Sequence, residues 1–158
     1  MAEHSNERIS VVAVLPDPED RKSLSGIISH SNWKLLFAET YEEVCAALKT
    51  ADAGPIVTDC CLPGGFGWRD LLQLATAVEN GPPIIVTGRL ADERLWAEVL
   101  NEGGYDVLMK PFEREEVLRS ISYAWRSWSD RRECVVQRKP KISDGISCAR
   151  SLQAGLGA

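Results

Sequence analysis

Three polar side chains with complementary chemistry follow apolar runs in this sequence. Asp59 ends the run "PIVTD", Thr87 lies near the end of "PPIIVTG", and Lys110 follows "YDVLM". A carboxylate, a hydroxyl and an ammonium group together suit an acyl-phosphate site, in which the carboxylate is the nucleophile and the other two groups bind phosphoryl oxygens. The alternative is that each residue has a structural role: Asp59 caps a turn, Thr87 is a β-branched strand residue and Lys110 is solvated.

These side chains can act together only if the elements before them end at one place. Runs typical of strands alternate along the chain with segments of helical spacing. The expected strands cover residues 9–15, 33–39, 55–59, 82–88 and 105–111, and the expected helices cover residues 18–29, 41–50, 67–79, 91–103 and 113–128. This alternation favours right-handed crossovers and a parallel sheet with helices on both faces. Ligands bind such α/β folds at the carboxyl ends of the strands, where the three residues are expected to converge.

The composition narrows the function classes. A chain of 158 residues with 44% hydrophobic content suits one domain with some spare chain. The net charge of -5 divides unevenly, because residues 124–158 contain seven Lys or Arg and three Asp or Glu, so the main body is acidic and the tail is basic. Five cysteines without CxxC spacing and only two histidines make a zinc site or a disulfide framework an unexpected outcome. With no signal peptide and no apolar stretch of about 18 residues, we expect a cytoplasmic protein.

Three segments of the chain resemble the receiver domain of two-component response regulators. "IVTDCCLPGGFGW" looks like that family's strand ending in the phosphoacceptor Asp, followed by its Leu/Met-Pro pair and glycine loop. "PIIVTG" resembles the family's Thr/Ser strand, and "GGYDVLMKPFEREEVL" resembles its Gly-rich turn, apolar strand, Lys-Pro pair and last helix. The resemblance covers about residues 8–125, with the three key residues separated by 28 and 23 positions. It implies a doubly wound, CheY-like α/β fold with a five-stranded parallel sheet in the order 2-1-3-4-5.

The resemblance also implies a role for each residue. Asp59 matches the phosphoacceptor, Thr87 the switch hydroxyl that turns toward the phosphoryl group, and Lys110 the lysine that pairs with it. Pro111 matches a proline whose preceding peptide bond is cis in the family. The implied function is phosphoryl acceptance on Asp59 within a two-component phosphorelay, by a signalling module that is not an enzyme.

The largest departure from the family pattern follows the first strand. Where receivers carry two adjacent acids that bind Mg²⁺, this chain has Leu15 and Pro16. The remaining ligands implied for Mg²⁺ are Asp59, Asp17 and the backbone carbonyl of Cys61, with Glu19 or Asp20 as alternatives to Asp17. Because Mg²⁺ gives up its waters reluctantly and is held by carboxylates, it is expected to bind weakly here and phosphoryl transfer is expected to be slow. Two functions therefore stay open: a receiver phosphorylated on Asp59, and a phosphorylation-independent pseudo-receiver that acts as a protein–protein interaction module.

Two further features lie near the predicted site. Val107 occupies the position of the family's switch aromatic, and the nearby Tyr105, expected on the same strand face, is either a surrogate or a turn residue; the turn interpretation is favoured. The adjacent Cys60 and Cys61 suggest redox chemistry. At a strand end, however, we expect them to face opposite ways and to act as small hydrophobic side chains.

The segment after the resemblance is too short for a DNA-binding output domain. We expect residues 126–158 to continue the last helix to about Cys134 and then to form a basic, disordered tail. Trp125 and Trp128 either form a homodimer or partner surface, or pack back on the domain.

The resemblance implies two kinds of protein partner. The phosphoryl donor is expected to be a sensor histidine kinase or a phosphotransfer protein. A downstream protein is expected to contact the face made by the last two helices and the strand between them. Neither a membrane nor nucleic acid is an expected partner, since the basic cluster "QRKPK" is a weak signal on an acidic protein.

Overall fold

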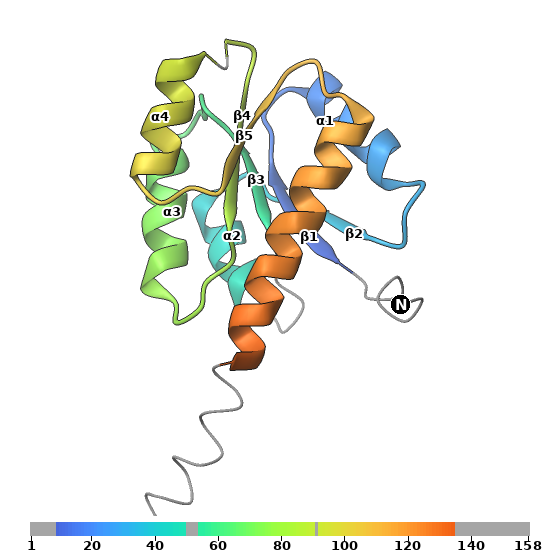
Figure 1. Cartoon of the computed structure of the whole chain (residues 1–158). Helices are drawn as coiled ribbons and strands as arrows, with labels where there is room; N and C mark the ends of the chain where they lie inside the picture. The colour runs from blue at the N-terminus through green and yellow to red at the C-terminus, as the bar shows by residue number, and fades with distance from the viewer. Residues whose placement is uncertain (1–8, 50–53, 91, 135–158) are drawn as a thin grey trace, which may run out of the picture.

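A single parallel sheet forms the centre of the molecule. The computed structural model describes residues 9–49, 54–90 and 92–134. The sheet has five strands in the order β2-β1-β3-β4-β5, which confirms the predicted fold. The strands are β1 (Ser10–Val14), β2 (Lys34–Phe37), β3 (Ile56–Asp59), β4 (Ile84–Gly88) and β5 (Asp106–Met109). Their carboxyl ends lie at the top of the molecule as drawn in Figure 1.

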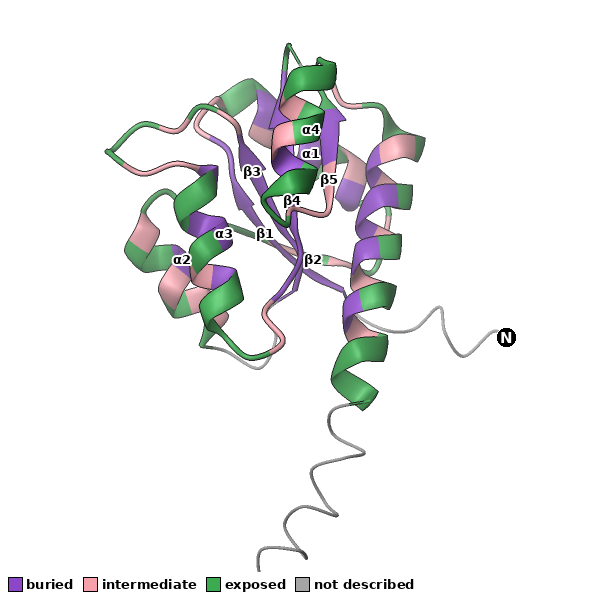
Figure 2. Cartoon of the chain, turned by 60° about the vertical axis from the view of Figure 1, so that its left-hand side comes forward, coloured by how far each residue is buried: buried purple, intermediate pink, exposed green. Residues whose placement is uncertain are grey.

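Helices cover both faces of the sheet. They are α1 (Pro18–Ile28), α2 (Tyr41–Leu48), α3 (Trp68–Ala77), α4 (Glu93–Asn101) and a last helix over residues 114–134. Side chains of α2, α3 and α4, such as Val44, Leu71 and Val99, form the core on one face. Side chains of α1 and the last helix, such as Leu24 and Ile121, form the core on the other. Figure 2 accordingly shows a buried sheet between helices that are buried on their inner sides and exposed on their outer sides.

Local sequence signals explain where the elements begin. All of β1 is buried, as expected for a continuous apolar run in a strand covered on both faces. The Asp17 side chain accepts a hydrogen bond from the Glu19 N–H at 2.9 Å, with Pro18 in the first helical position, so α1 begins where predicted. The Thr40 hydroxyl caps α2 by accepting a hydrogen bond from the Glu43 N–H at 3.1 Å. Residues 50 and 91, which the expected helices included, lie outside the described part of the chain.

The two tryptophans of the last helix pack back on the domain. Trp128 is only 4% exposed, and its Nε1–H donates to the Asn80 carbonyl at 2.6 Å. The Trp125 and Trp128 rings meet edge to face at 5.3 Å between centroids, and the Arg132 guanidinium lies 4.6 Å from the Trp128 ring centroid. Trp128 therefore ties the last helix to the loop before β4, and the alternative of an exposed partner surface at this side chain is wrong.

The described residues include only the first part of the C-terminal segment. The last helix runs to residue 134 in the described range, while the tail expected to be disordered, residues 135–158, lies outside it. The division of the chain at residue 125 stays a prediction. None of the helices in the described ranges combines the length and hydropathy needed to cross a membrane.

Candidate functional site

The sheet brings the three predicted site residues to one edge. Asp59 is the last residue of β3 and is the register partner of Thr87 in β4. Lys110 follows β5, and its backbone N–H donates to the Gly88 carbonyl at 3.0 Å. The Lys110 Nζ contacts Asp59 Oδ2 in an ion pair. Asp59, Thr87 and Lys110 are 7%, 0% and 7% exposed, so all three polar side chains are buried.

The loop after β3 holds the Asp59 carboxylate from its other side. The Cys61 N–H donates to Asp59 Oδ1 at 3.2 Å. Gly64 and Gly65 have φ angles of +91° and +79°, a conformation that favours glycine and explains the "PGG" turn. The Lys110–Pro111 peptide bond is cis, as the family resemblance implied.

A fourth residue, Asp20, completes the buried polar group. Asp20 lies in the first turn of α1, is 7% exposed, and its Oδ2 is 2.6 Å from the Lys110 Nζ. From the sequence, Asp20 was expected only as an alternative metal ligand. A stronger signal was present, because Asp20, Leu24 and Ile28 are spaced four residues apart and form the buried stripe of α1. An acid on that stripe must point inward.

Lys110 is the cation shared by the two buried carboxylates. Burial lowers the pKa of Lys110, but hydrogen bonding and attraction by Asp20 and Asp59 more than offset this effect, so the pKa is raised above its ordinary value. The ammonium group is therefore charged at neutral pH. It pairs with the Asp59 carboxylate and holds it in a fixed place.

Thr87 carries a hydroxyl that its surroundings leave unused. Its Oγ1 is fully buried and has no hydrogen-bond partner among the described residues. A buried, unpaired hydroxyl is costly, and such groups are often retained for a function. A hydroxyl beside Asp59 and free of other partners is suited to donate to an oxygen of a group attached to Asp59.

Replacing Thr87 with valine is expected to stabilise the protein while removing this donor. Valine has the same shape without the unpaired hydroxyl, so the free energy of unfolding should rise by about 1–2 kcal/mol in urea denaturation. The matched control is Thr58→Val, at a residue that is equally buried but donates its hydroxyl to the Asp59 carbonyl at 3.2 Å. Thr58→Val should not stabilise. Equal effects of the two substitutions would contradict this account of Thr87.

The segment after β1 has no acidic pair to offer a metal ion. Leu15, 1% exposed, packs in the core beneath α1 and the last helix, and Pro16 follows it. Asp17 uses one carboxylate oxygen to cap α1 through the Glu19 N–H, and its Oδ2 lies 3.0 Å from the Arg89 guanidinium.

As arranged, these oxygens do not fit Mg²⁺. Asp59 and Asp20 are both paired with Lys110, and Asp17 is paired with Arg89, so a metal ion would have to displace these cations. The described residues also contain no cluster of three or more His, Cys, Asp or Glu that could hold a metal ion. Magnesium binding through Asp17, Asp59 and the Cys61 carbonyl stays a prediction that the side-chain arrangement does not favour.

The cysteine pair differs from expectation in its geometry. The Cys60 and Cys61 sulfur atoms are 3.7 Å apart, so the expectation that they face opposite ways is wrong. The reason is that β3 ends at Asp59, so strand alternation does not extend to the cysteines. Burial, and then the neighbouring Cys61 and Asp59, raise the pKa of the Cys60 thiol to about 12. A protonated thiol is a poor nucleophile, which agrees with the rejection of a redox role.

Val107 lies at the position of the family's switch aromatic, and Tyr105 does not lie on the same face of the sheet. Val107 is buried in the core beneath α2, α3 and α4, whereas Tyr105 packs with the core on the opposite face of the sheet. The expectation that the two share a face is therefore wrong, because Tyr105 precedes the first residue of β5. Tyr105 belongs to the turn, as the favoured interpretation held.

Comparison with known proteins identifies the family. The model described as "Response regulator receiver domain" matches residues 11–122, and the chain belongs to this family. The transcriptional regulatory protein FixJ of Rhizobium meliloti (strain 1021) is 28% identical over 114 residues, which cover 72% of this chain and 55% of FixJ. The C4-dicarboxylate transport transcriptional regulatory protein DctD of Pseudomonas aeruginosa is also 28% identical over 114 residues, with 24% of that protein covered. The chain thus spans about half or less of the length of these relatives.

Solved structures agree on the fold. The signal receiver domain of an HD domain-containing protein from Pseudomonas fluorescens Pf-5 superposes with a TM-score of 0.70 at 22% identity, covering 80% of this chain and 93% of that one. The receiver domain of the sensor histidine kinase PA1611 from Pseudomonas aeruginosa PAO1, solved with a magnesium ion coordinated in its active-site cleft, gives a TM-score of 0.63 at 23% identity, covering 75% and 98%. Receiver domains generally bind Mg²⁺ there, interact with histidine kinases or phosphotransfer proteins, and are signalling modules rather than enzymes.

Proposed function

We propose that this receiver domain accepts a phosphoryl group on Asp59. A carboxylate oxygen of Asp59 forms a bond to phosphorus as the bond from phosphorus to the donor's nitrogen breaks, and the nitrogen leaves with the bonding electron pair. With phosphoramidate as a small donor, the products are the aspartyl phosphate and ammonia. The physiological donor would be a phosphohistidine of a sensor histidine kinase or of a phosphotransfer protein.

One observation carries this proposal: a buried carboxylate is paired with an ammonium group and lies beside a hydroxyl that has no hydrogen-bond partner among the described residues. Lys110 is placed to neutralise the phosphoryl oxygens, and the Thr87 hydroxyl is placed to donate to one of them. Thr87 lies in β4 and Lys110 directly follows β5, so the sheet sets the positions of both groups before the phosphoryl group arrives.

A phosphorylation-independent interaction module is the second proposal. It is favoured by the same ion pairs that disfavour Mg²⁺, because Lys110 already neutralises Asp59 in the absence of any phosphoryl group. In that case the buried polar group would serve only to hold β3, β5 and α1 together.

Intact-mass measurement separates the two proposals. The protein is incubated with phosphoramidate, and a mass gain of one phosphoryl group is expected in the wild type but not in Asp59→Asn. Asp70→Asn is the matched control, since that carboxylate accepts from the Gly67 N–H at the start of α3, outside the site. If the wild type were not labelled, phosphorylation would be excluded and the interaction module would be the remaining proposal. Equal labelling of Asp59→Asn would exclude Asp59 as the acceptor.

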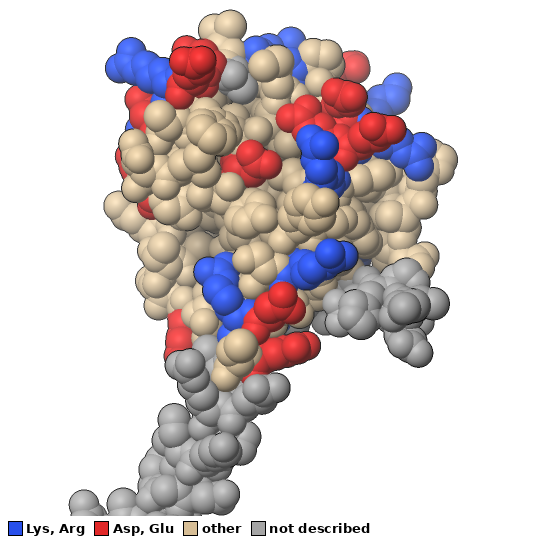
Figure 3. Space-filling view, viewed as in Figure 1, with Lys and Arg blue, Asp and Glu red and all other residues tan. Residues whose placement is uncertain are grey.

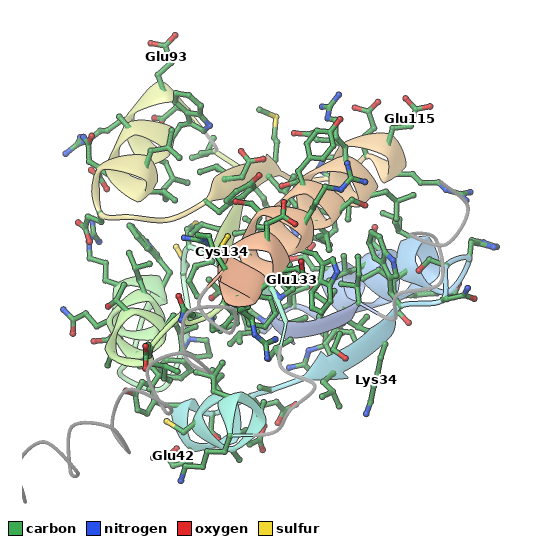
Figure 4. All side chains as sticks on the ribbon, turned by 60° about the horizontal axis from the view of Figure 1, so that its bottom comes forward. Lys34, Glu42, Glu93, Glu115, Glu133 and Cys134 are labelled. Carbon is green, nitrogen blue, oxygen red and sulfur yellow. The ribbon has the colours of Figure 1, made fainter. Side chains whose placement is uncertain are left out.

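We propose that the domain contacts its downstream partner through the surface formed by α4, β5 and the last helix. A pocket of about 200 Å³ is lined there by Asp92, Glu93, Trp96, Val107, Met109 and Glu116. Trp96 and Met109 are 51% and 52% exposed. Figure 3 shows that the surface between α4 and the last helix is mainly uncharged, and Figure 4 shows Glu93 and Glu115 pointing outward from the starts of those helices. An apolar centre with an acidic rim suits a downstream protein with an apolar patch bordered by basic residues.

A further inference from the structure

An ion pair crosses above the proposed phosphoacceptor. Asp17 follows β1 and Arg89 directly follows β4, and these strands lie on either side of β3 in the sheet. The Arg89 guanidinium is 3.0 Å from Asp17 Oδ2. A contact between the loops after β1 and β4 must pass over the carboxyl end of β3, whose last residue is Asp59. The same three strand ends lie together at the top of Figure 1.

We infer that Arg89 is a catalytic residue that binds the incoming phosphoryl group at Asp59 and supplies positive charge that a metal ion would otherwise supply. This inference rests on the proposed phosphorylation of Asp59. The buried group has two carboxylates, Asp20 and Asp59, for the single ammonium of Lys110. A phosphoryl group adds further negative charge at this point, and a second cation is needed to offset it.

The Arg89–Asp17 ion pair is weak enough for Arg89 to leave Asp17 and bind a phosphoryl group instead. The side chains are 70% and 36% exposed, and ion pairs so open to water contribute little to stability. A guanidinium binds phosphoryl oxygens through two parallel hydrogen bonds, which makes the phosphoryl group a strong competitor for Arg89. Asp17 would lose only the contact of Oδ2, because Oδ1 continues to cap α1. The exchange therefore leaves the fold unchanged.

Arg89 takes no part in the bond changes themselves. Arginine stays protonated in proteins, so it neither gives nor takes a proton. The bond from Asp59 to phosphorus forms and the donor's phosphorus–nitrogen bond breaks as in the proposed function, and the guanidinium stabilises the charge on the moving phosphoryl oxygens.

The rate of labelling by phosphoramidate, with Mg²⁺ or with EDTA, tests this role. The wild type should be labelled in EDTA at a rate within about threefold of that in Mg²⁺, because the site offers the metal few free oxygens. Arg89→Gln should be labelled at least about tenfold more slowly in EDTA, and Arg89→Lys should recover part of the loss, since it keeps the charge but not the planar fork. The matched control is Arg94→Gln, an arginine on α4 that is 87% exposed and pairs with Glu98, and it should label like the wild type.

Releasing Arg89 from Asp17 should not slow labelling. Asparagine caps helices as well as aspartate does, so Asp17→Asn removes the ion pair and keeps the start of α1. Labelling in EDTA should then stay equal or rise by up to about fivefold, which corresponds to the cost of opening an exposed pair. A loss of labelling in Asp17→Asn would show that Asp17 itself is required, and would overturn the inference.

A spectroscopic readout separates contact from a structural role. The Arg89 side-chain N–H resonance, assigned by its loss in Arg89→Gln, should shift when the wild type is labelled. In Asp59→Asn under the same conditions it should stay in place. Labelling that requires Mg²⁺, or that is unaffected by Arg89→Gln, overturns this inference alone. A wild type that is labelled under neither condition overturns the proposed phosphorylation and this inference with it.

Discussion

Lys110→Gln is expected to slow phosphorylation of Asp59 by at least about a hundredfold, because removing one pre-placed electrostatic group from a buried reaction site costs two to three orders of magnitude. The Lys110 side chain is only 5% exposed and its ammonium group contacts the Asp59 carboxylate directly, so water cannot replace it. The measurement is the initial rate of phosphoramidate labelling by intact mass.

The same substitution also removes a buried cation, so its effect on rate must be separated from its effect on folding. In the double variant Asp20→Asn/Lys110→Gln, Asp20→Asn removes one of the two carboxylates that Lys110→Gln leaves without a cation. The double variant should regain stability without regaining the labelling rate. If labelling returned together with stability, Lys110 would be a structural residue only.

Lys110→Gln is also expected to lower the free energy of unfolding by about 3–5 kcal/mol at pH 7, which is the usual cost of removing one partner from a buried ion pair. The pKa of Lys110 is raised in the folded protein above the ordinary value of 10.5. Its contribution to stability is therefore complete below pH 10.5 and is lost as the pH rises through the folded-state pKa.

Urea denaturation of both proteins from pH 7 into the alkaline range measures this contribution. The difference in free energy of unfolding between wild type and Lys110→Gln should be constant up to about pH 10 and then shrink. Other groups that titrate in this range affect both proteins alike and cancel in the difference. A difference that grew with pH would contradict the assigned direction of the shift.

The fold and the position of the site could be predicted because both depend on short-range patterns. The apolar runs predicted the five strands, and their alternation with helical segments favoured the parallel arrangement that the sheet has. A polar residue at the carboxyl end of such a strand lies at the binding edge whatever the loop conformation is. Asp59, Thr87 and Lys110 were located by this rule.

The contacts that could not be predicted depend on the conformations of the loops and on which groups these loops bring within reach of a side chain. The Arg89–Asp17 pair joins residues 72 positions apart through two loops, and no periodic pattern predicts such a contact. The Trp128 bond to the Asn80 carbonyl likewise required the last helix to be placed against the α3–β4 loop. Strand alternation failed at Cys60 and at Tyr105 for a common reason: each lies one residue outside a strand. The burial of Asp20 is different, because its place on the buried stripe of α1 follows from the helical spacing of the sequence.

We propose that Asp59 receives the phosphoryl group in a site formed with Thr87 and Lys110. To test this, the wild type is labelled with phosphoramidate, the acyl phosphate is reduced with borohydride, and the modified residue is located by peptide mass spectrometry. We expect conversion of residue 59 to homoserine, and loss of this product in Lys110→Gln. Modification at another carboxylate, or no modification in a labelled protein, would contradict it.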